Sequence, residues 1–555
     1  MLINPETKYR PFNAFPFPER TWPSKTITKA PIWCAVDMRD GNQSLINPMD
    51  HDRKIRFFKL LVDCGFKQIE VGFPSASDTE FNFVRYLIDN NMIPDDVTIQ
   101  VLTAARPELI ERTFEALKGA KKVVIHVYNA IAEIFRRIVF NKSQDEIIDM
   151  ATTATQLVVD QCNKNPQTHW TFEYSPENFS LAEIEYAVRI CEAVADVWKP
   201  SEQRPMIINL PSSVEASTPN VFADQIEYFC THFSQRSKVC ISVHPHNDRG
   251  TAIAASELAL LAGADRIEGC LFGNGERTGN ADLVTLALNL YSQGIHPNLD
   301  FHDIKHIGEV VKECNELPIH PRHPYVGDLV FTAFSGSHQD AIKKGFQNHQ
   351  KQNHTYWEMP YLPIDPADLG CSYEAVIRVN SQSGKSGAAW ILQQNHGIEL
   401  PPHLQREFSI IIQQKTDQSG HELTPAEIWS IFREHYGLTG QNKLTLQEFN
   451  VEQNAPNSTK LKLTLNIDGK KSTMEGEGNG VLSAGTAILK EKTHLDFRIV
   501  EYNEHTLGKN SDSRSISYIK CSNRAGESFW GVAIDNDILS SSLKALLNAV
   551  SKFIG

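Results

Sequence analysis

The segment 239–250 of the chain, VCISVHPHNDRG, decides the fold, because an apolar run gives way here to a polar one. Val239–Val243 is short, apolar and rich in β-branched residues, a composition typical of a buried strand. The polar segment His244–Asp248 follows it, and an amphipathic helical pattern then covers about 251–263. A strand, a polar loop and an amphipathic helix in this order predict one β/α unit of a parallel sheet.

The same three-part unit is repeated along the first half of the chain. The apolar runs are Ile32–Asp37, Gln68–Phe73, Val97–Thr103, Lys122–Tyr128, Trp170–Tyr174, Met206–Leu210, Val239–Val243 and Arg266–Phe272. The helical patterns between them cover about 52–64, 79–90, 107–119, 143–162, 181–198, 218–233, 251–263 and 282–294. Eight strands and eight helices in strict alternation predict an α/β fold of the (β/α)8, or TIM, barrel type. An open doubly wound sheet stays as the alternative if one run is miscounted, although no GxGxxG motif follows the first strand.

Two other regions flank the predicted barrel, which covers residues 31–305. Residues 1–30 are rich in proline, which fixes the backbone and predicts an extended N-terminal arm. Residues 306–430 combine polar and aromatic loops with helix-like segments near 303–315 and 336–346. The sequence therefore predicts helical linker subdomains between the barrel and a second domain.

Residues 431–555 predict a C-terminal α+β regulatory domain built of two ββα units. One copy runs from Lys460 through IDGK and GEGNG to SAGTAIL, and the other from Ser515 through NRAGES and GVAIDND to SSSLKALLNAV. Two such units pack into one small domain, and a crevice between them suits a small effector. A purely dimerising domain fits this pattern equally well.

The composition excludes some classes of partner. With 54 Lys and Arg against 67 Asp and Glu, the formal net charge is −13, which argues against a nucleic-acid partner. The ten cysteines are scattered without a CxxC pair, which is typical of reduced cytosolic thiols. The N-terminus lacks a signal-peptide pattern, and no apolar run has the length of a membrane span. The sequence predicts a cytoplasmic protein without a membrane partner.

The two histidines of the opening segment are candidate metal ligands. His244 and His246 are two residues apart on an extended segment, so both rings point to the same face. In a barrel, functional groups gather at the carboxyl ends of the strands, where Asp40 and Asn280 would join the pair. Two nitrogen and two oxygen ligands without a thiolate suit Mg2+, Mn2+ or Zn2+, with positions left open for a substrate. Polar packing of the two histidines is the alternative.

Two further charged residues lie near predicted strand ends. Arg39 would act either as a clamp on Asp40 or as a cation over a ketone, where it would stabilise a developing alkoxide. Glu173 is either a substrate-orienting carboxylate or part of an interior ion pair. The loop GNGERTGN (273–280) lacks the GxxxxGK pattern of phosphate loops, and its glycines would allow a tight turn that brings Asn280 to the metal.

The chain resembles the family of acyl-CoA-condensing barrels, which includes the 2-isopropylmalate, homocitrate and citramalate synthases and 3-hydroxy-3-methylglutaryl-CoA lyase. The resemblance is carried by DMRDGNQ (37–43), HPHND (244–248) and GNGERTGN (273–280). Further segments are similar to the longer type of the 2-isopropylmalate synthase family: FSGSHQDAI (334–342), PYLPIDP (360–366), VNSQSGK (379–385) and YNEHTLG (502–508). The resemblance runs over nearly the whole chain.

This resemblance implies an acyltransferase that condenses acetyl-CoA with 3-methyl-2-oxobutanoate and then hydrolyses the thioester. The product would be 2-isopropylmalate, at the committed step toward leucine. The implied divalent metal, Mg2+ before Mn2+ or Zn2+, would be held by Asp40, His244, His246 and Asn280. Carried over in the same way, Arg39 would polarise the ketone and Glu173 would contact the substrate.

The resemblance also implies a set of residues around the substrate. His338 would act as the base beside Tyr361, both supplied by the partner subunit of a homodimer. A capping or interface role is the alternative for His338. The remaining implied pocket residues are Leu102, His126, Tyr128, Asn209, Pro211, Ser213 and Glu276.

Two positions depart from the pattern of the family. Ser213 stands where the family often has threonine, so the hydroxyl is kept and a methyl group is lost. The run Gly508–Tyr518 carries Arg514 and several serines, where small glycine and alanine residues normally line a leucine effector pocket. These changes would make that pocket more polar or smaller.

Three other functions fit parts of the same sequence. A related synthase, such as a citramalate or homocitrate synthase, would use another 2-oxo acid, and a homocitrate synthase would want a basic group for the second carboxylate. A lyase that runs the reverse cleavage usually ends soon after the barrel. A non-catalytic effector-binding protein would have no reason to keep all four candidate metal ligands.

Overall fold

The structure is a computed structural model. It describes residues 7–8, 12, 15–333, 335–352, 356–371, 387–419, 423–440, 442–455, 458–467, 469–508 and 513–554. The chain divides into two compact units, of which the first comprises Met1–Val330 with Asp368–Cys371 and the second Phe331–Ala367 with Ser372–Gly555. The motif VNSQSGK (379–385) lies outside the described residues.

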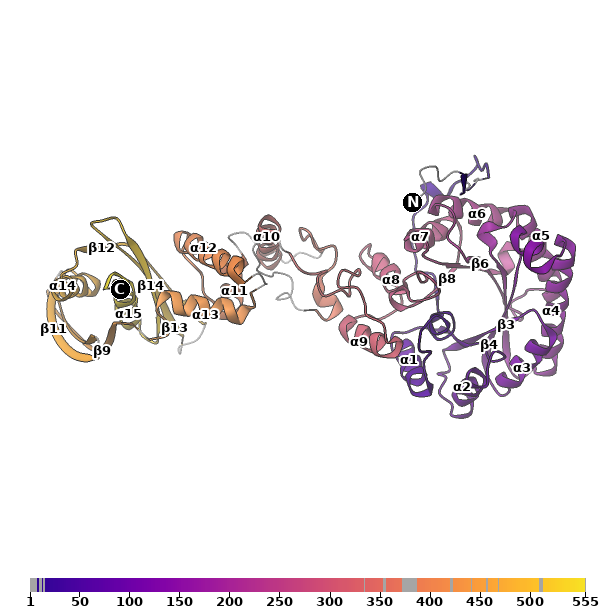
Figure 1. Cartoon of the computed structure of the whole chain (residues 1–555), viewed down its shortest axis with the longest axis horizontal. Coiled ribbons are helices and arrows are strands. Elements are labelled where there is room, and N and C mark those ends of the chain that lie inside the picture. The colour runs from indigo at the N-terminus through magenta and orange to yellow at the C-terminus, as the bar shows by residue number, and fades with distance from the viewer. Residues whose placement is uncertain are drawn as a thin grey trace. The chain divides into compact units, whose positions relative to one another are not determined.

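The first unit is a closed barrel of eight parallel strands with a helix after each strand (Figure 1), which confirms the predicted TIM barrel. The strands are β1 (Ile32–Ala35), β2 (Gln68–Gly72), β3 (Thr98–Ala104), β4 (Lys122–Ala130), β5 (His169–Glu177), β6 (Met206–Ser212), β7 (Cys240–Pro245) and β8 (Arg266–Gly269). The helices are α1 (His51–Asp63), α2 (Asp78–Asp89), α3 (Pro107–Leu117), α4 (Gln144–Lys164), α5 (Ile184–Trp198), α6 (Pro219–His232), α7 (Ala252–Ala262) and α8 (Leu283–Tyr291).

Most predicted elements end within a few residues of the observed ones, and two strands differ in ways that matter for the site. Strand β5 continues to Glu177, three residues beyond its predicted end. Strand β8 stops at Gly269, where the Ala281 carbonyl oxygen approaches so closely that a Cβ would lie 2.3 Å from it. The chain instead forms the short turn η7 (Leu271–Gly273) after β8. The carboxyl end of the barrel is therefore longer at β5 and shorter at β8 than the apolar runs indicate.

The N-terminal arm packs against α6 from residue 15 onward. The Trp22 indole, in the turn η2 (Trp22–Ser24), donates a hydrogen bond to Asp224 over 2.8 Å. Lys25 forms an ion pair of 2.9 Å with Glu227, a carboxylate that is only 2% exposed. Buried carboxylates need such partners, so the arm and α6 stabilise one another.

Short turns and one more helix complete the first unit. Helix α9 (Ile304–Asn315) packs against α1 at the position of the predicted segment near 303–315. The turns are η3 (Asp37–Gly41), η4 (Phe135–Phe140), η5 (Phe179–Leu181), η6 (Arg236–Lys238) and η8 (Pro366–Leu369). Among the helices in the described part of the chain, none combines the length and apolarity that a membrane span needs.

The second unit begins with four helices. They are α10 (Gly336–Gln352), α11 (Gly387–His396), α12 (Pro402–Ser419) and α13 (Pro425–Tyr436). Apolar side chains of α11, α12 and α13 share a core with Ile516, Tyr518 and Trp530 of the following sheet. The helical character predicted for the linker region is confirmed, although the sequence pattern located only the first of these helices.

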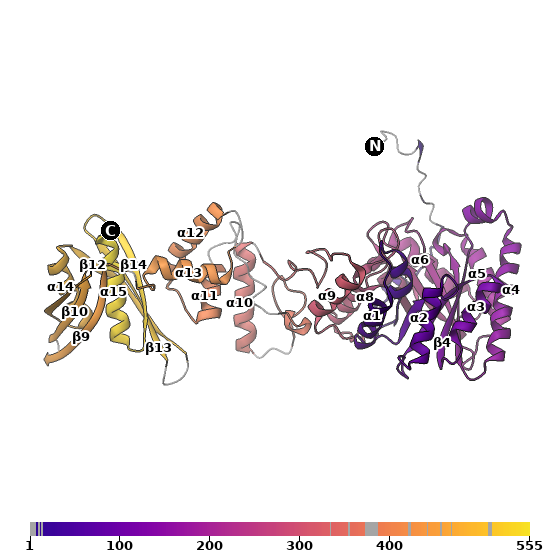
Figure 2. The ribbon, with the colours of Figure 1, turned by 60° about the horizontal axis from the view of Figure 1, so that its bottom comes forward.

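The remainder of the second unit contains two repeats, and each has one strand more than predicted. The first repeat is β9 (Leu444–Ala455), β10 (Ser458–Ile467), β11 (Lys470–Gly478) and α14 (Val481–Thr493). The second is β12 (Phe497–Leu507), β13 (Arg514–Asn523), β14 (Ser528–Asp535) and α15 (Ile538–Ile554). Each repeat forms an antiparallel sheet, ordered β11-β10-β9 or β12-β13-β14, and α14 and α15 pack on these strands (Figure 2). The units are therefore βββα rather than ββα.

Candidate metal centre and substrate pocket

The candidate metal ligands come from three neighbouring loops at the carboxyl end of the barrel. Asp40 lies in η3, a wide π-type helical turn directly after β1 that is closed by the Gly41 amide donating to the Val36 carbonyl. His244 is part of β7, and His246 follows that strand. Asn280 lies beyond β8, at the end of the loop 273–280. The sequence placed these side chains at adjacent strand ends, and the barrel brings them together.

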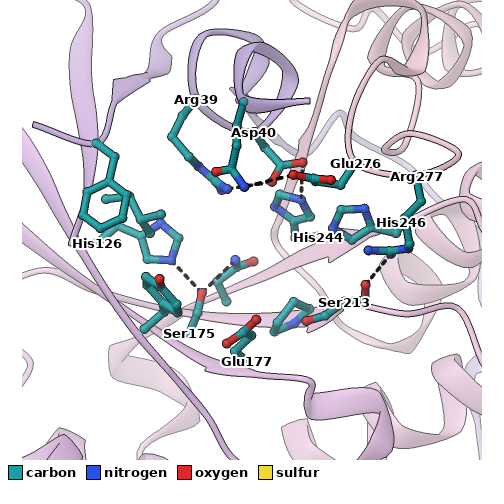
Figure 3. A pocket seen from close by; sticks show the side chains of 16 residues that line it. Arg39, Asp40, His126, Ser175, Glu177, Ser213, His244, His246, Glu276 and Arg277 are labelled. Carbon is teal, nitrogen blue, oxygen red and sulfur yellow. Dashed lines mark hydrogen bonds and ion pairs between the residues drawn. The ribbon is translucent and has the colours of Figure 1, made fainter. Parts of the chain in front are cut away.

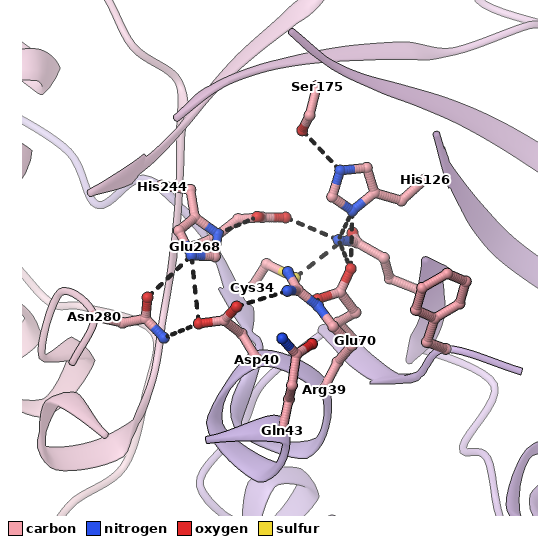
Figure 4. Close-up of polar contacts among 12 residues, drawn as sticks. Cys34, Arg39, Asp40, Gln43, Glu70, His126, Ser175, His244, Glu268 and Asn280 are labelled. Atoms are coloured by element: carbon pink, nitrogen blue, oxygen red, sulfur yellow. Dashed lines mark hydrogen bonds and ion pairs between the residues drawn. The ribbon is translucent and has the colours of Figure 1, made fainter. Parts of the chain in front are cut away.

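Interatomic distances show how closely these four side chains converge. His244 Nε2 lies 3.0 Å from Asn280 Oδ1 and 4.0 Å from Asp40 Oδ2. The Asn280 amide donates to Asp40 Oδ2 over 2.8 Å, which turns its own oxygen toward His244 (Figure 4). Ligand atoms of Asp40, His244 and His246 all lie within 4.8 Å of one another, and all three residues are buried. This spacing is that of side chains able to share one cation.

The charge states of Asp40 and His246 fit a divalent cation. Although burial opposes it, Arg39 and the two histidines hold the pKa of Asp40 well below its ordinary value, so this group is a carboxylate. Burial, together with the neighbouring His244, lowers the pKa of His246 to about 4, so its ring is neutral and free to coordinate. His246 Nδ1 is also buried without a hydrogen-bond partner. A buried polar atom of this kind costs stability unless something binds it.

The candidate ligands form one wall of a pocket of about 240 Å³ (Figure 3). All seven residues that the family resemblance implied for substrate binding line it: Leu102, His126, Tyr128, Asn209, Pro211, Ser213 and Glu276. The pocket is also lined by Phe73, which the sequence analysis did not single out. Phe73 comes directly after β2, and its amide donates to Glu80 over 3.2 Å. Carboxylates and histidines thus share the pocket with an apolar wall formed by Phe73, Leu102 and Pro211.

Arg39 is fixed at the edge of this pocket by two carboxylates. Its guanidinium forms ion pairs with Asp40, over 2.7 Å, and with the fully buried Glu70. Burial works against the charge, but these two carboxylates raise the pKa of Arg39 above its ordinary value. Arg39 therefore presents a permanent, oriented positive charge to the pocket.

Glu173 is fully buried in the barrel interior and does not line the pocket. Its carboxylate lies 3.5 Å from both Arg266 and His126, which fits the interior ion pair that was the alternative for this residue. Because β5 is longer than predicted, the pocket receives Ser175 and Glu177 instead. Burial raises the pKa of Glu177, with Arg39 opposing the shift. The alternation of side chains along a strand that ends at Glu177 would have identified both residues.

The loop 273–280 owes its shape to its glycines. Gly279 has φ +101°, and a Cβ there would lie 1.9 Å from the Gly273 carbonyl oxygen. This close approach lets the backbone N–H of Asn280 donate a hydrogen bond of 3.1 Å to the Gly273 carbonyl oxygen. Arg277 joins the loop to its neighbours by donating to Asp248 and, over 2.6 Å, to the Ser213 carbonyl. The predicted tight turn toward Asn280 agrees with this backbone.

His338 and Tyr361 belong to the second unit, and they lie side by side there. Their rings stack with centroids 3.9 Å apart. Tyr361 has φ +62°, a conformation that is rare for a residue with a large side chain and that often marks functional sites. The two residues thus form a single aromatic pair, with Tyr361 61% exposed.

Fold and site together define a class of protein: a (β/α)8 barrel with a candidate metal centre of histidine, carboxylate and amide side chains at the carboxyl ends of its strands. Residues 30–311 match the HMGL-like family, residues 328–393 the alpha-isopropylmalate synthase post-catalytic domain-like family, and residues 422–554 the LeuA allosteric (dimerisation) domain. The 2-isopropylmalate synthase of Marinomonas sp. (strain MWYL1) is 54% identical over 550 residues, which cover 99% of both chains. That of Pseudomonas putida (strain GB-1) is 54% identical over 555 residues, covering all of this chain and 98% of its own. The chain belongs to the 2-isopropylmalate synthase family.

Proposed function

We propose that this chain condenses acetyl-CoA with 3-methyl-2-oxobutanoate and hydrolyses the resulting thioester, giving 2-isopropylmalate and CoA. The observation that carries this proposal is a candidate metal centre that shares one pocket with an apolar wall. A 2-oxo acid offers a carboxylate and a carbonyl oxygen to the first and a branched side chain to the second. The full-length similarity to 2-isopropylmalate synthases points to the same reaction.

Asp40, His244, His246 and Asn280 would hold the cation, for which Mg2+ fits the oxygen ligands and Mn2+ or Zn2+ the histidines. When bound, a divalent cation supplies Lewis-acid polarisation of the ketone and orients the 2-oxo acid. Arg39, held between Asp40 and Glu70, would stabilise the negative charge that develops on the ketone oxygen during attack. Its fixed position means that little reorganisation accompanies this step.

Proton transfer at the methyl group of acetyl-CoA needs a base, and two candidates follow from the structure. His338, paired with Tyr361, would take the proton if a partner subunit brings this pair to the barrel. Glu177 lines the pocket, and burial raises the pKa of its carboxyl, which makes this carboxylate a stronger proton acceptor. We assign the orienting role first given to Glu173 to Glu177.

The shape and charge of the pocket favour a branched apolar 2-oxo acid over its relatives. Leu102, Pro211 and Phe73 offer the apolar surface that an isopropyl group needs. Of the two arginines in the pocket, Arg39 is assigned to the ketone oxygen and Arg277 is paired with Asp248, so neither adds an unpaired charge for a second substrate carboxylate as in 2-oxoglutarate. Related synthases that use pyruvate or 2-oxoglutarate are therefore the weaker alternative.

Further parts of the proposal concern the whole protein. We propose an arm (1–30), a catalytic barrel (31–305), linker subdomains (306–430) and a regulatory domain (431–555) that supports a homodimer. The match to the LeuA allosteric (dimerisation) domain supports the dimer, and leucine is proposed as a weak effector because of the polar run 508–518. Mixed with both substrates, the purified protein should form 2-isopropylmalate, detected by mass spectrometry, only when a divalent cation is present. Product formation after complete chelation would contradict the metal-dependent mechanism.

A further inference from the structure

We propose that Glu268 is a positioning residue that selects the metal-binding tautomer of His244. Glu268 lies on β8, is fully buried, and does not line the pocket. Its Oε2 atom accepts from His244 Nδ1 over 2.8 Å. The inference rests on the proposed metal centre and names the residue that prepares one of its ligands.

The carboxylate of Glu268 accepts four hydrogen bonds, of which Figure 4 shows the one from His244. Oε1 accepts from Arg266 over 2.9 Å and from Gln100 over 2.8 Å, while Oε2 accepts from His244 and, over 3.0 Å, from Asn209. A carboxylate offers about four lone-pair sites, so these donors occupy all of them. These four hydrogen bonds restrict the Glu268 carboxylate to one orientation, and the carboxylate in turn orients the His244 ring and the Asn209 amide.

This orientation fixes the proton on the His244 ring. A carboxylate only accepts hydrogen bonds, so His244 Nδ1 must carry the proton of this bond, which leaves Nε2 as the nitrogen able to coordinate a cation. Nε2 is the atom that faces Asn280 Oδ1 and Asp40 Oδ2. His246 has no comparable anchor, since its Nδ1 atom is buried without a partner. His244 is therefore the ligand prepared in advance of metal binding.

Glu268 also connects the metal centre with the substrate pocket. Asn209, which shares Oε2 with His244, lines the pocket and donates to Ser175 over 3.0 Å as well. Its amide group therefore depends on the same carboxylate as the metal ligand. Under the proposed function, the 2-oxo acid contacts both the metal centre and Asn209. A substitution at Glu268 should therefore weaken the binding of the 2-oxo acid more than the binding of acetyl-CoA.

Replacing Glu268 by glutamine would invert the tautomer while preserving the volume of the side chain. Arg266 and Gln100 both donate to the Oε1 position, so the amide oxygen would stay there. The amide nitrogen would then take the Oε2 position, where it would donate to His244 Nδ1 and the Asn209 amide would lose its acceptor. Nδ1 would become the acceptor, and the proton on Nε2 would block the lone pair that the metal requires.

The test compares Mn2+ binding by the full-length wild-type protein and the Glu268→Gln variant, using titration calorimetry. Loss of such an outer partner typically weakens metal binding about 10- to 100-fold, and we expect a loss in this range. The Glu227→Gln variant is the control, because it removes another buried carboxyl, one that contacts Thr21 and Lys25 of the N-terminal arm rather than His244 or Arg266. Its Mn2+ affinity should stay within about threefold of wild type, the level of effects without a shared partner.

Two further readouts separate positioning from a general loss of stability. In a His244→Ala background, Glu268→Gln should cause no additional loss of Mn2+ affinity, because the ring through which it acts is gone. In the otherwise wild-type protein, it should raise KM for the 2-oxo acid more than KM for acetyl-CoA. Equal Mn2+ affinity of wild type and Glu268→Gln, or additive losses with His244→Ala, would overturn the inference and leave the proposed function standing. A wild-type protein that binds no Mn2+ would overturn both.

Discussion

At the scale of single residues, the candidate metal centre combines ligands that are held by the protein with one that is not. Asp40 is held by Arg39 and Asn280, and His244 by Glu268. His246 Nδ1 has no hydrogen-bond partner although it is buried. Substitution of Asp40 or His244 should therefore lower the free energy of unfolding more than substitution of His246.

The His246→Ala variant should keep the fold and lose metal-dependent turnover. His246 Nδ1 has no protein partner, so its removal leaves no neighbouring donor or acceptor unpaired. Without metal, we therefore expect the free energy of unfolding to change by about 1 kcal/mol or less. Turnover at saturating Mg2+ should fall at least about 100-fold, through loss of Lewis-acid catalysis. Thermal melts and initial rates check the two parts, and unchanged activity would remove His246 from the metal centre.

The two carboxyls of β5 should differ sharply in catalysis. Glu177 lines the pocket, whereas Glu173 is buried beneath it. If Glu177 transfers a proton, Glu177→Gln should lower kcat about 100-fold or more, and Glu173→Gln should have a much smaller effect. Steady-state kinetics of both variants decide this, and the reverse order would restore Glu173 as the functional carboxylate.

Asp37, at the start of η3, should make stability depend on pH. Burial raises the pKa of Asp37 from 3.8 to about 8, so the folded protein binds one more proton than the unfolded chain between these values. Its contribution to stability is therefore complete below about pH 4 and is lost as pH rises through 8. Asp37→Asn should melt at a higher temperature than wild type at pH 8, with the two converging near pH 4. Parallel melting curves across this range would contradict the assignment.

At this scale the sequence predicted the ligands better than the pocket carboxylate. His244 and His246 could be found because alternation along a strand puts both rings on one face. Glu177 was missed because the polar segment Ser175–Glu177 looked like a loop, while hydrogen bonds to β4 extend the strand to its end. Pairing with a neighbouring strand is not visible in the hydropathy of a single segment.

At the scale of elements, the loop 273–280 determines where Asn280 lies. Gly279→Ala should abolish metal binding, because the new Cβ would lie 1.9 Å from the Gly273 carbonyl oxygen at φ +101°. Gly294→Ala is the matched control: its φ is +80°, and nothing lies within 4 Å of its Cβ position. We expect this control to lose about 1 kcal/mol of stability and to bind Mn2+ like wild type. Equal Mn2+ affinity of the two variants would show that the loop can relax.

Elements with a strong pattern were predictable, and those with a weak one were not. The barrel helices end near their predicted limits because amphipathic periodicity and polar caps, such as Ser143 before α4, agree. Strands β9 and β12 were both missed. For β12 the reason is that the strand is largely exposed and alternates charged with apolar residues. Such strands form through pairing, as β12 does with β13.

At the scale of the whole molecule, the second unit should respond only weakly to leucine. Ser517 Oγ lies 2.8 Å from Ser541 Oγ and 3.1 Å from Ser542 Oγ, so these buried hydroxyls satisfy one another. An apolar effector would have to break these bonds without replacing them, which is unfavourable. Millimolar leucine should therefore inhibit turnover by less than half, and strong inhibition at micromolar leucine would contradict this view of the region.

The central claim is that the metal centre and the apolar wall select a branched 2-oxo acid for condensation with acetyl-CoA. The direct measurement is release of free CoA thiol with acetyl-CoA and a panel of 2-oxo acids, with Mg2+ and after chelation. We predict that 3-methyl-2-oxobutanoate gives a kcat/KM at least about tenfold above pyruvate and 2-oxoglutarate, and that chelation abolishes release. A preference for pyruvate or 2-oxoglutarate would contradict the account.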